Sequence, residues 1–194
     1  MEDDYLSDFE SASKYKTMFE MDTNHRVIYL KSFSKIMFPG QRLGLTVLPQ
    51  ELTTEFVELK EVIDIQTNTL SQVIMQTFIE SGLYEHHKDK IVLRHRKKAD
   101  TLRNALKIHF EHYIFNDNHQ MHTVIELPKE MNMNKLYQEL AKRNVLVDDH
   151  NKNYVSTYKR NHKFLKLNTT SISENRIEQG ICLILEAIEA SKIF

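Results

Sequence analysis

A short polar segment between two apolar runs contains the side chains with the greatest chemical potential in this sequence. Ser32, Ser34, Lys35 and Arg42 surround a Pro39-Gly40 turn. The hydroxyl groups can donate hydrogen bonds, the lysine carries an amine that can act as a nucleophile, and the arginine carries a fixed positive charge. Such side chains could hold a phosphate group beside a reactive amine.

Two apolar runs must position this segment. Residues 27–30 are β-branched, aromatic or aliphatic, and a second apolar run covers residues 43–48. Runs of this length and composition, bounded by turn residues, predict a strand, a polar loop and a second strand. Each polar residue taken singly is an ordinary solvent-exposed loop residue, so the chemical interpretation depends on their order and spacing.

That order and spacing resemble the active-site lysine motif of fold-type I pyridoxal-phosphate enzymes of the aminotransferase class I/II form. In that motif S/T-x-S-K is followed seven residues later by an arginine, and here Arg42 follows Lys35 at that distance. The resemblance implies that Lys35 is the catalytic residue and binds pyridoxal 5′-phosphate covalently. It also implies that Ser32, Ser34 and Arg42 bind the cofactor phosphate, with Arg42 contributing its planar fork.

The first ten residues resemble a second motif. Their composition alone would indicate a frayed acidic terminus. In MocR-type regulators, which join a winged-helix DNA-binding region to an aminotransferase-like domain, a strand ends in EDDY-D-S-E-F about thirty residues before the lysine, and residues 2–9 are similar. The resemblance implies that Asp3 pairs with the pyridine nitrogen and Tyr5 donates to the ring hydroxyl. A carboxylate at that nitrogen keeps it protonated and makes the ring a better electron sink.

Composition sets wider limits. The chain has 194 residues, a net charge of −1 and 41% hydrophobic residues, as in ordinary soluble, helix-rich proteins. A single cysteine, Cys182, excludes an internal disulfide and suits a reducing compartment. We find no apolar run long enough to span a membrane, and the polar start is neither a signal nor a transit peptide. We therefore expect a cytoplasmic protein with no membrane partner.

Helical periodicity dominates the middle of the chain. Residues 51–82 predict a pair of amphipathic helices with a core face, ending at Gly82, and residues 85–110 predict a long charged helix. Its basic stretch, residues 94–98, is typical of a solvated face, so we expect no direct nucleic-acid binding by this chain. The histidines at positions 86, 87, 95, 109, 112, 119 and 122 have no metal-ligand spacing, and we predict no metal site.

The last part of the chain alternates strands and helices. We predict a strand at residues 121–127, a helix at 133–143, strands at 145–147 and 164–168, and a final helix lined by Ile177, Ile181, Ile184 and Ile188. The final helix is predicted to be capped by Ser173 or by a capping box from Ser171 to Glu174. This order predicts an α+β layer, and it matches the small C-terminal domain of the aminotransferase fold.

The strand at 164–168 departs from the family pattern. The corresponding strand usually reads L-R-L-x-F, and its arginine binds the substrate carboxylate, whereas this sequence has Lys166. A lysine can pair with a carboxylate only as a point charge. An equally good interpretation is that Lys166 is the outward residue of a half-buried strand. Arg160, in the preceding loop, is a weaker candidate for the same role.

Together, these features predict an α/β fold that is the incomplete C-terminal portion of a fold-type I pyridoxal-phosphate transferase. Residues 1–85 would be the remnant of the cofactor-binding large domain with connecting helices, and residues 86–194 the small α+β domain. Because the resemblance covers only the second half of the catalytic domain, we expect a truncated reading frame, a split one or a fragment, inactive alone.

The resemblance favours the effector-sensing part of a MocR/GntR-type transcription regulator. Its ligand would be an amino acid or amine, and it would form a homodimer if completed by upstream residues. Two alternatives stay open, namely a fragment of a free-standing class I/II aminotransferase and a non-catalytic remnant that acts as an interaction module.

Overall fold

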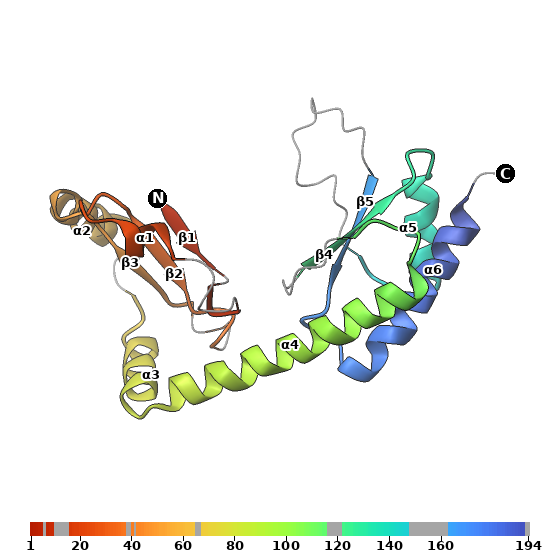
Figure 1. Ribbon diagram of the computed structural model, residues 1–194. Helices are drawn as coiled ribbons and strands as arrows, with labels where there is room; N and C mark the ends of the chain where they lie inside the picture. Colours follow the sequence, from red (N-terminus) through yellow and green to blue (C-terminus); the bar gives the residue numbers. More distant parts are fainter. Residues whose placement is uncertain are drawn as a thin grey trace. The chain divides into compact units, whose positions relative to one another are not determined.

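The computed structural model describes residues 1–5, 7–9, 16–37, 40, 42–64, 67–115, 122–147 and 163–192. The chain divides into an N-terminal unit, Met1–Leu93, and a C-terminal unit, Arg94–Phe194 (Figure 1). The division falls within helix α4 (Leu83–His109), and the expected domain boundary at residues 85 and 86 lies in the first turn of that helix.

The N-terminal unit contains a three-stranded sheet in the order β1-β2-β3. Strand β1 (Glu2–Asp4) runs parallel to β2 (Tyr29–Ser32), and β3 (Gly44–Val47) pairs antiparallel with β2. A 3₁₀ turn, η1 (Ser7–Phe9), follows β1, and the short helix α1 (Met18–Met21) precedes β2. The predicted strand, loop and strand around the lysine motif are therefore confirmed.

Helix α1 is fastened to the start of β1. The Glu2 carboxylate accepts hydrogen bonds from the backbone N–H groups of Met18 and Phe19 at 3.1 and 2.9 Å. A carboxylate at a helix N-terminus satisfies N–H groups that have no partner within the helix. The Phe19 ring then stacks on Tyr29 of β2, with 4.9 Å between centroids.

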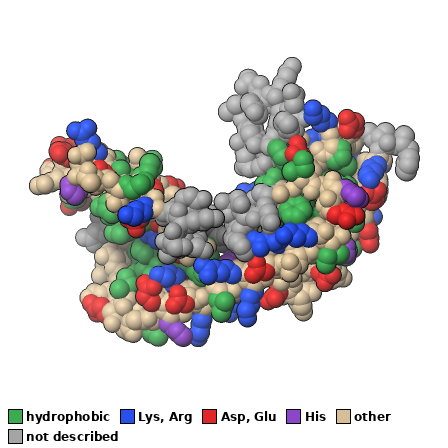
Figure 2. Space-filling view, viewed as in Figure 1, with side chains coloured by type: hydrophobic (Ala, Val, Ile, Leu, Met, Phe, Trp, Pro, Cys, Tyr) green, Lys and Arg blue, Asp and Glu red, His purple; other side chains and the backbone are tan. Residues whose placement is uncertain are grey.

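Helices α2 (Gln50–Asp64) and α3 (Thr69–Glu80) follow β3. Two helices were expected here, and Gly82 ends the second as predicted, because it takes a φ of 72° that suits a glycine. The expected core face is wrong for α2, which buries none of its residues within the part of the chain that the structure describes. Among the described elements, none makes an extensive contact with α2. Phe56, Leu59, Val62 and Ile63 are exposed, and hydrophobic side chains are visible on the surface of this unit (Figure 2).

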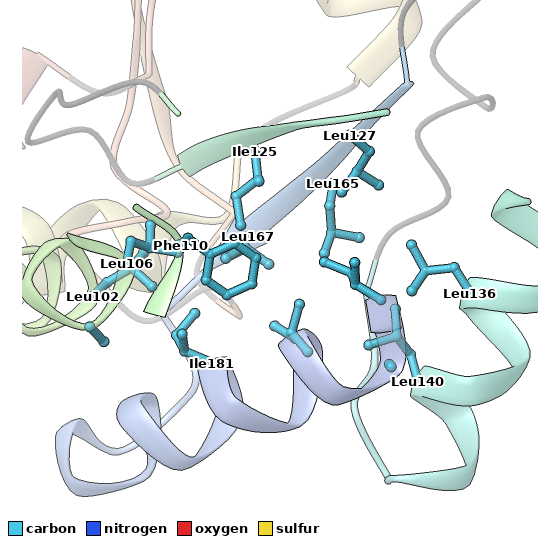
Figure 3. Close-up of a cluster of buried hydrophobic side chains, with 14 of the residues drawn as sticks. Leu102, Leu106, Phe110, Ile125, Leu127, Leu136, Leu140, Leu165, Leu167 and Ile181 are labelled. Carbon is cyan, nitrogen blue, oxygen red and sulfur yellow. The ribbon is translucent and has the colours of Figure 1, made fainter. Parts of the chain in front are cut away.

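The C-terminal unit packs helices on one face of a two-stranded sheet. Strands β4 (His122–Leu127) and β5 (Lys163–Asn168) pair antiparallel, and α5 (Met133–Lys142), η4 (Glu174–Arg176) and α6 (Ile177–Ser191) complete the layer. Leu102 and Leu106, near the end of α4, and Phe110, directly after it, fill the core together with side chains from β4, β5, α5 and α6 (Figure 3). The predicted α+β layer is confirmed.

Two local predictions in this unit are wrong. Residues 145–147 form no strand because the Val145 N–H donates to the Leu140 carbonyl oxygen at 2.9 Å, while Asn144 takes a φ of 56°. These backbone groups close the C-terminus of α5 in a Schellman motif and cannot join a ladder there. Ser173 precedes η4 and makes no side-chain capping bond, and α6 itself begins after Arg176.

Across the described ranges, no helix combines the length and apolar character needed to cross a membrane.

The first prediction concerns the stability of the C-terminal unit. Leu136 is fully buried, so Leu136→Ala should destabilise the unit by about 2–5 kcal/mol through lost burial and a residual cavity. Leu146 is 93% exposed, and Leu146→Ala should change stability by no more than about 0.5 kcal/mol. Native-state hydrogen exchange at the α6 amides measures both values in the full chain. Equal effects of the two substitutions would contradict this core assignment.

Candidate functional site

Parallel pairing of β1 with β2 brings the two sequence motifs together. The register aligns Asp3 with Leu30 and Asp4 with Lys31. Successive side chains of a strand point to opposite faces, so Asp3 and Leu30 lie on one face of the sheet and Asp4 and Lys31 on the other. The Asp3 side chain is exposed, whereas Asp4 is buried. Asp3 is thereby available to a ligand on its face.

The loop that carries the lysine is held at both ends. Ser32 closes β2, and its Oγ accepts a hydrogen bond from the Ser34 backbone N–H at 3.4 Å. Beyond Lys35, the N–H groups of Ile36 and Met37 donate to the Phe33 carbonyl oxygen at 3.1 and 2.7 Å. Both side chains are buried, Ile36 almost completely. Lys35 itself is half-buried on this anchored turn.

Lys35 contacts the first motif directly. Its Nζ lies 5.2 Å from the centroid of the Tyr5 ring, within the range of a cation–π interaction. Tyr5 follows β1 and is 43% exposed. Two residues that the sequence analysis took from separate motifs are therefore neighbours in space.

Arg42 lies at the far end of the loop, where the chain returns to the sheet. Its φ is 52°, in the left-handed region that non-glycine residues seldom adopt. The next residue, Leu43, accepts a hydrogen bond from the Phe33 N–H at 3.4 Å, which joins the two ends of the loop. Uncommon backbone conformations cluster at ligand sites, and the exposed Arg42 side chain is open to a ligand.

Five polar side chains offer groups that suit a phosphorylated pyridine aldehyde. They are the hydroxyl groups of Ser32 and Ser34, the Arg42 guanidinium, the Lys35 amine and the Asp3 carboxylate. Hydroxyls and a guanidinium suit a phosphate, an amine suits an aldehyde, and a carboxylate suits a protonated ring nitrogen.

The two carboxylate-binding candidates belong to the other unit. Lys166 is half-buried in β5, opposite Val124, and it lines a pocket of about 340 Å³ together with Asn168 and Thr170. Arg160 lies outside the described residues. The roles of both remain predictions. Among the residues that the structure describes, no three histidine, cysteine, aspartate or glutamate side chains are grouped to hold a metal ion.

A polar network that no sequence motif indicated lies on the opposite face of the sheet. The Lys31 Nζ forms ion pairs with Asp4 at 3.1 Å and Asp8 at 2.6 Å. Asp4 also accepts hydrogen bonds from the hydroxyl groups of Ser7, at 2.6 Å, and Tyr29. Strand alternation could have indicated this network, because it places Asp4 opposite to Asp3 and Lys31 opposite to Ser32.

The network sets the protonation of its members. Burial acts to raise the pKa of the Asp4 carboxyl, but hydrogen bonds from Ser7, Tyr29 and Lys31 outweigh it and hold that pKa below its ordinary value. Burial and the hydrogen bond to Asp4 raise the pKa of Tyr29, so its phenol stays protonated and donates. Among the described residues, Tyr84 makes no hydrogen bond to this network, but burial and the nearby charge of Asp8 raise its pKa as well.

Comparison with known proteins places this geometry in context. The family "Aminotransferase class I and II" matches residues 3–182. The uncharacterized HTH-type transcriptional regulator YcxD of Bacillus subtilis (strain 168) is 34% identical over 191 residues, which are 95% of this chain and 43% of the relative.

Two solved structures are also similar. The multiple substrate aminotransferase of Thermococcus profundus gives a TM-score of 0.87 at 26% identity, over 98% of this chain and 47% of that chain. The kynurenine aminotransferase of Pyrococcus horikoshii, in complex with PMP, gives a TM-score of 0.83 at 26% identity, over 95% of this chain and 46% of that chain. This chain thus has the fold of a part of these enzymes, and it spans less than half the length of each of the three relatives.

The second prediction concerns the contribution of Asp4 to stability and its dependence on pH. A carboxyl whose pKa is lowered by folding contributes stability that is complete above its unfolded value, near 3.8, and is lost as the pH falls through the lower folded value. Asp4→Asn should therefore lower the free energy of unfolding near pH 7 by about 1–3 kcal/mol. The difference from wild type should shrink below pH 3.8.

Urea unfolding at a series of pH values, followed by tyrosine fluorescence, measures this effect. Asp64→Asn is the matched control, because Asp64 pairs with Lys60 on the exposed surface and should contribute less than about 1 kcal/mol. A gap between Asp4→Asn and wild type that grows as the pH falls would refute the network's role.

Proposed function

The chain belongs to the aminotransferase class I and II family, and we propose that its N-terminal unit provides one part of a pyridoxal 5′-phosphate site. Lys35 would hold the cofactor through its side-chain amine, the group in this loop that suits an aldehyde. When bound, the cofactor supplies an electron sink for chemistry at the carbon that bears a substrate amine. The observation that carries this proposal is the contact between Lys35 and Tyr5, which unites the two motifs.

The other side chains have distinct roles. Asp3 pairs with the ring nitrogen and keeps it protonated, and Tyr5 donates a hydrogen bond to the ring oxygen. Ser32, Ser34 and Arg42 bind the phosphate at the two ends of the lysine loop. The PMP found in the Pyrococcus horikoshii relative is the amine form of the same cofactor, which supports this assignment.

We further propose that the whole protein is a regulator of the MocR/GntR type, with this chain as part of its effector-sensing domain. The support is the similarity to a helix-turn-helix regulator along almost the entire chain. The ligand would be an amino acid or amine whose carboxylate, where present, pairs with Lys166 or Arg160. The protein would act in the cytoplasm as a homodimer, and DNA binding would belong to a segment outside this chain.

A free-standing aminotransferase is the second candidate, and the similarity to aminotransferases in both solved structures favours it. The two functions differ in outcome, because an aminotransferase converts an amino acid to its keto acid whereas a sensor binds the ligand and retains it. Incubating the full-length, cofactor-loaded protein with a panel of amino acids and assaying keto acids separates them. Stoichiometric cofactor binding without any keto acid would exclude the enzyme.

Cofactor binding by the chain makes a third prediction. After titration with pyridoxal 5′-phosphate and borohydride reduction, peptide mapping should find most of the label on Lys35, and Lys35→Ala should abolish saturable labelling. Asp3→Ala should keep the label on Lys35 but alter the absorption band of the bound cofactor, because the ring nitrogen loses its carboxylate. Lys60→Ala, which removes an exposed lysine of α2, is the control and should change neither result. Diffuse labelling of many lysines, unchanged in Lys35→Ala, would instead support a non-catalytic remnant.

A further inference from the structure

We propose that Lys31 is a positioning residue for the cofactor site, which it reaches through Tyr5. The inference rests on the proposed function and deepens it. Lys31 lies on the face of the sheet opposite to Asp3 and Ser32 and so does not line the site itself. Its side chain instead fixes the segment in which Tyr5 lies.

The Lys31 ammonium group has three short contacts, all to that segment. Its Nζ lies 3.1 Å from Asp4 Oδ2, 3.0 Å from Ser7 Oγ and 2.6 Å from Asp8 Oδ2. An ammonium group has three N–H donors, so these contacts can use all of them. The side chain is only 11% exposed, which protects the ion pairs from solvent screening.

The residues that Lys31 contacts lie on both sides of Tyr5 in the sequence. Asp4 precedes it directly, and Ser7 and Asp8 follow within three residues. Ser7 also closes the turn onto Asp4, because its N–H donates to Asp4 Oδ1 at 3.0 Å and its hydroxyl donates to Asp4 Oδ2 at 2.6 Å. Lys31 therefore holds residues on both sides of Tyr5, and the Tyr5 ring in this segment contacts the Lys35 Nζ.

The backbone ladder does not extend over this segment. The ladder between β1 and β2 ends at Asp4, which aligns with Lys31, so Tyr5 is beyond its last paired residue. A side chain from β2 that reaches Asp8 extends the connection past the end of the strand. Lys31 therefore fixes the position of the segment that carries Tyr5, as the backbone ladder fixes the position of Asp3.

A merely structural role is the competing explanation. A buried ion pair can hold a fold together with no influence on a ligand, and breaking one is destabilising wherever it lies. Loss of stability in a Lys31 variant would thus be ambiguous. The decisive readouts are the absorption band of the bound cofactor and the dependence of the effect on Tyr5.

The experiment measures pyridoxal 5′-phosphate affinity, the absorption band and the fraction of borohydride-trapped label on Lys35. Lys31→Met removes the charge at similar length and should weaken affinity by about tenfold, since small misplacements of a positioned group have effects of this size or more. It should also alter the absorption band in the same direction as Tyr5→Phe does. Lys31→Arg retains the charge and should recover most of the affinity. The matched control is Lys60→Met, which removes an exposed ion pair with Asp64 and should match wild type.

A double-mutant cycle tests the route through Tyr5. If Lys31 acts by placing the Tyr5 hydroxyl group, then Lys31→Met should have much less effect on affinity in the Tyr5→Phe background. If Lys31→Met fails to fold by circular dichroism, Asp8→Asn serves in its place. It removes the shortest of the three contacts and leaves the pair between Lys31 and Asp4 intact.

Each outcome decides the inference. The inference is supported if Lys31→Met weakens cofactor affinity and shifts the absorption band, if these effects do not add to those of Tyr5→Phe, and if Lys31→Arg recovers the affinity. The inference is overturned if the wild-type chain is labelled at Lys35 but Lys31→Met has unchanged cofactor affinity. It is also overturned if the effects of Lys31→Met and Tyr5→Phe on affinity are fully additive. Either result leaves the proposed function standing. Failure of the wild-type chain to be labelled at Lys35 overturns the proposed function and this inference together.

Discussion

The parallel pairing of β1 with β2 is the constraint on which the candidate site depends. Neither motif can form a cofactor site alone, because one carries the carboxylate and the phenol and the other carries the amine. The ladder from Glu2–Tyr29 to Asp4–Lys31 sets them side by side at one end of the sheet. A slip of the register by one residue would move Asp3 to the opposite face and leave Asp4 facing the site.

The two faces of this sheet differ, because one carries candidate site residues and the other carries a buried polar network. One face presents the exposed Asp3 and the end of β2 that leads to Lys35. The other face buries Asp4 against Lys31, with Asp8, Ser7 and Tyr29 satisfying the remaining donors and acceptors. Buried charges are tolerated when they are paired and hydrogen-bonded, and such fully satisfied networks favour one arrangement over its neighbours.

Much of the fold followed from patterns that act locally. Helical spacing gave α4, α5 and α6 because their buried side chains recur with the period of the helix, and Gly82 marked a terminus by its backbone freedom. The two motifs could be recognised because they place certain residue types at fixed spacing, and the parallel pairing of β1 with β2 brings them together, but the roles of their residues stay predictions. Patterns failed where a residue's role is set by contacts that the local pattern does not show. Val145 is used to close α5, α2 exposes its apolar face, and Lys31 acquires meaning only through acids that precede it by more than twenty residues.

A crystal structure of the protein soaked with pyridoxal 5′-phosphate tests the central claim most directly. The account predicts electron density that is continuous from the Lys35 Nζ to the cofactor, with Asp3 at the ring nitrogen and the phosphate among Ser32, Ser34 and Arg42. Density on other lysines, or a phosphate held away from the lysine loop, would contradict it.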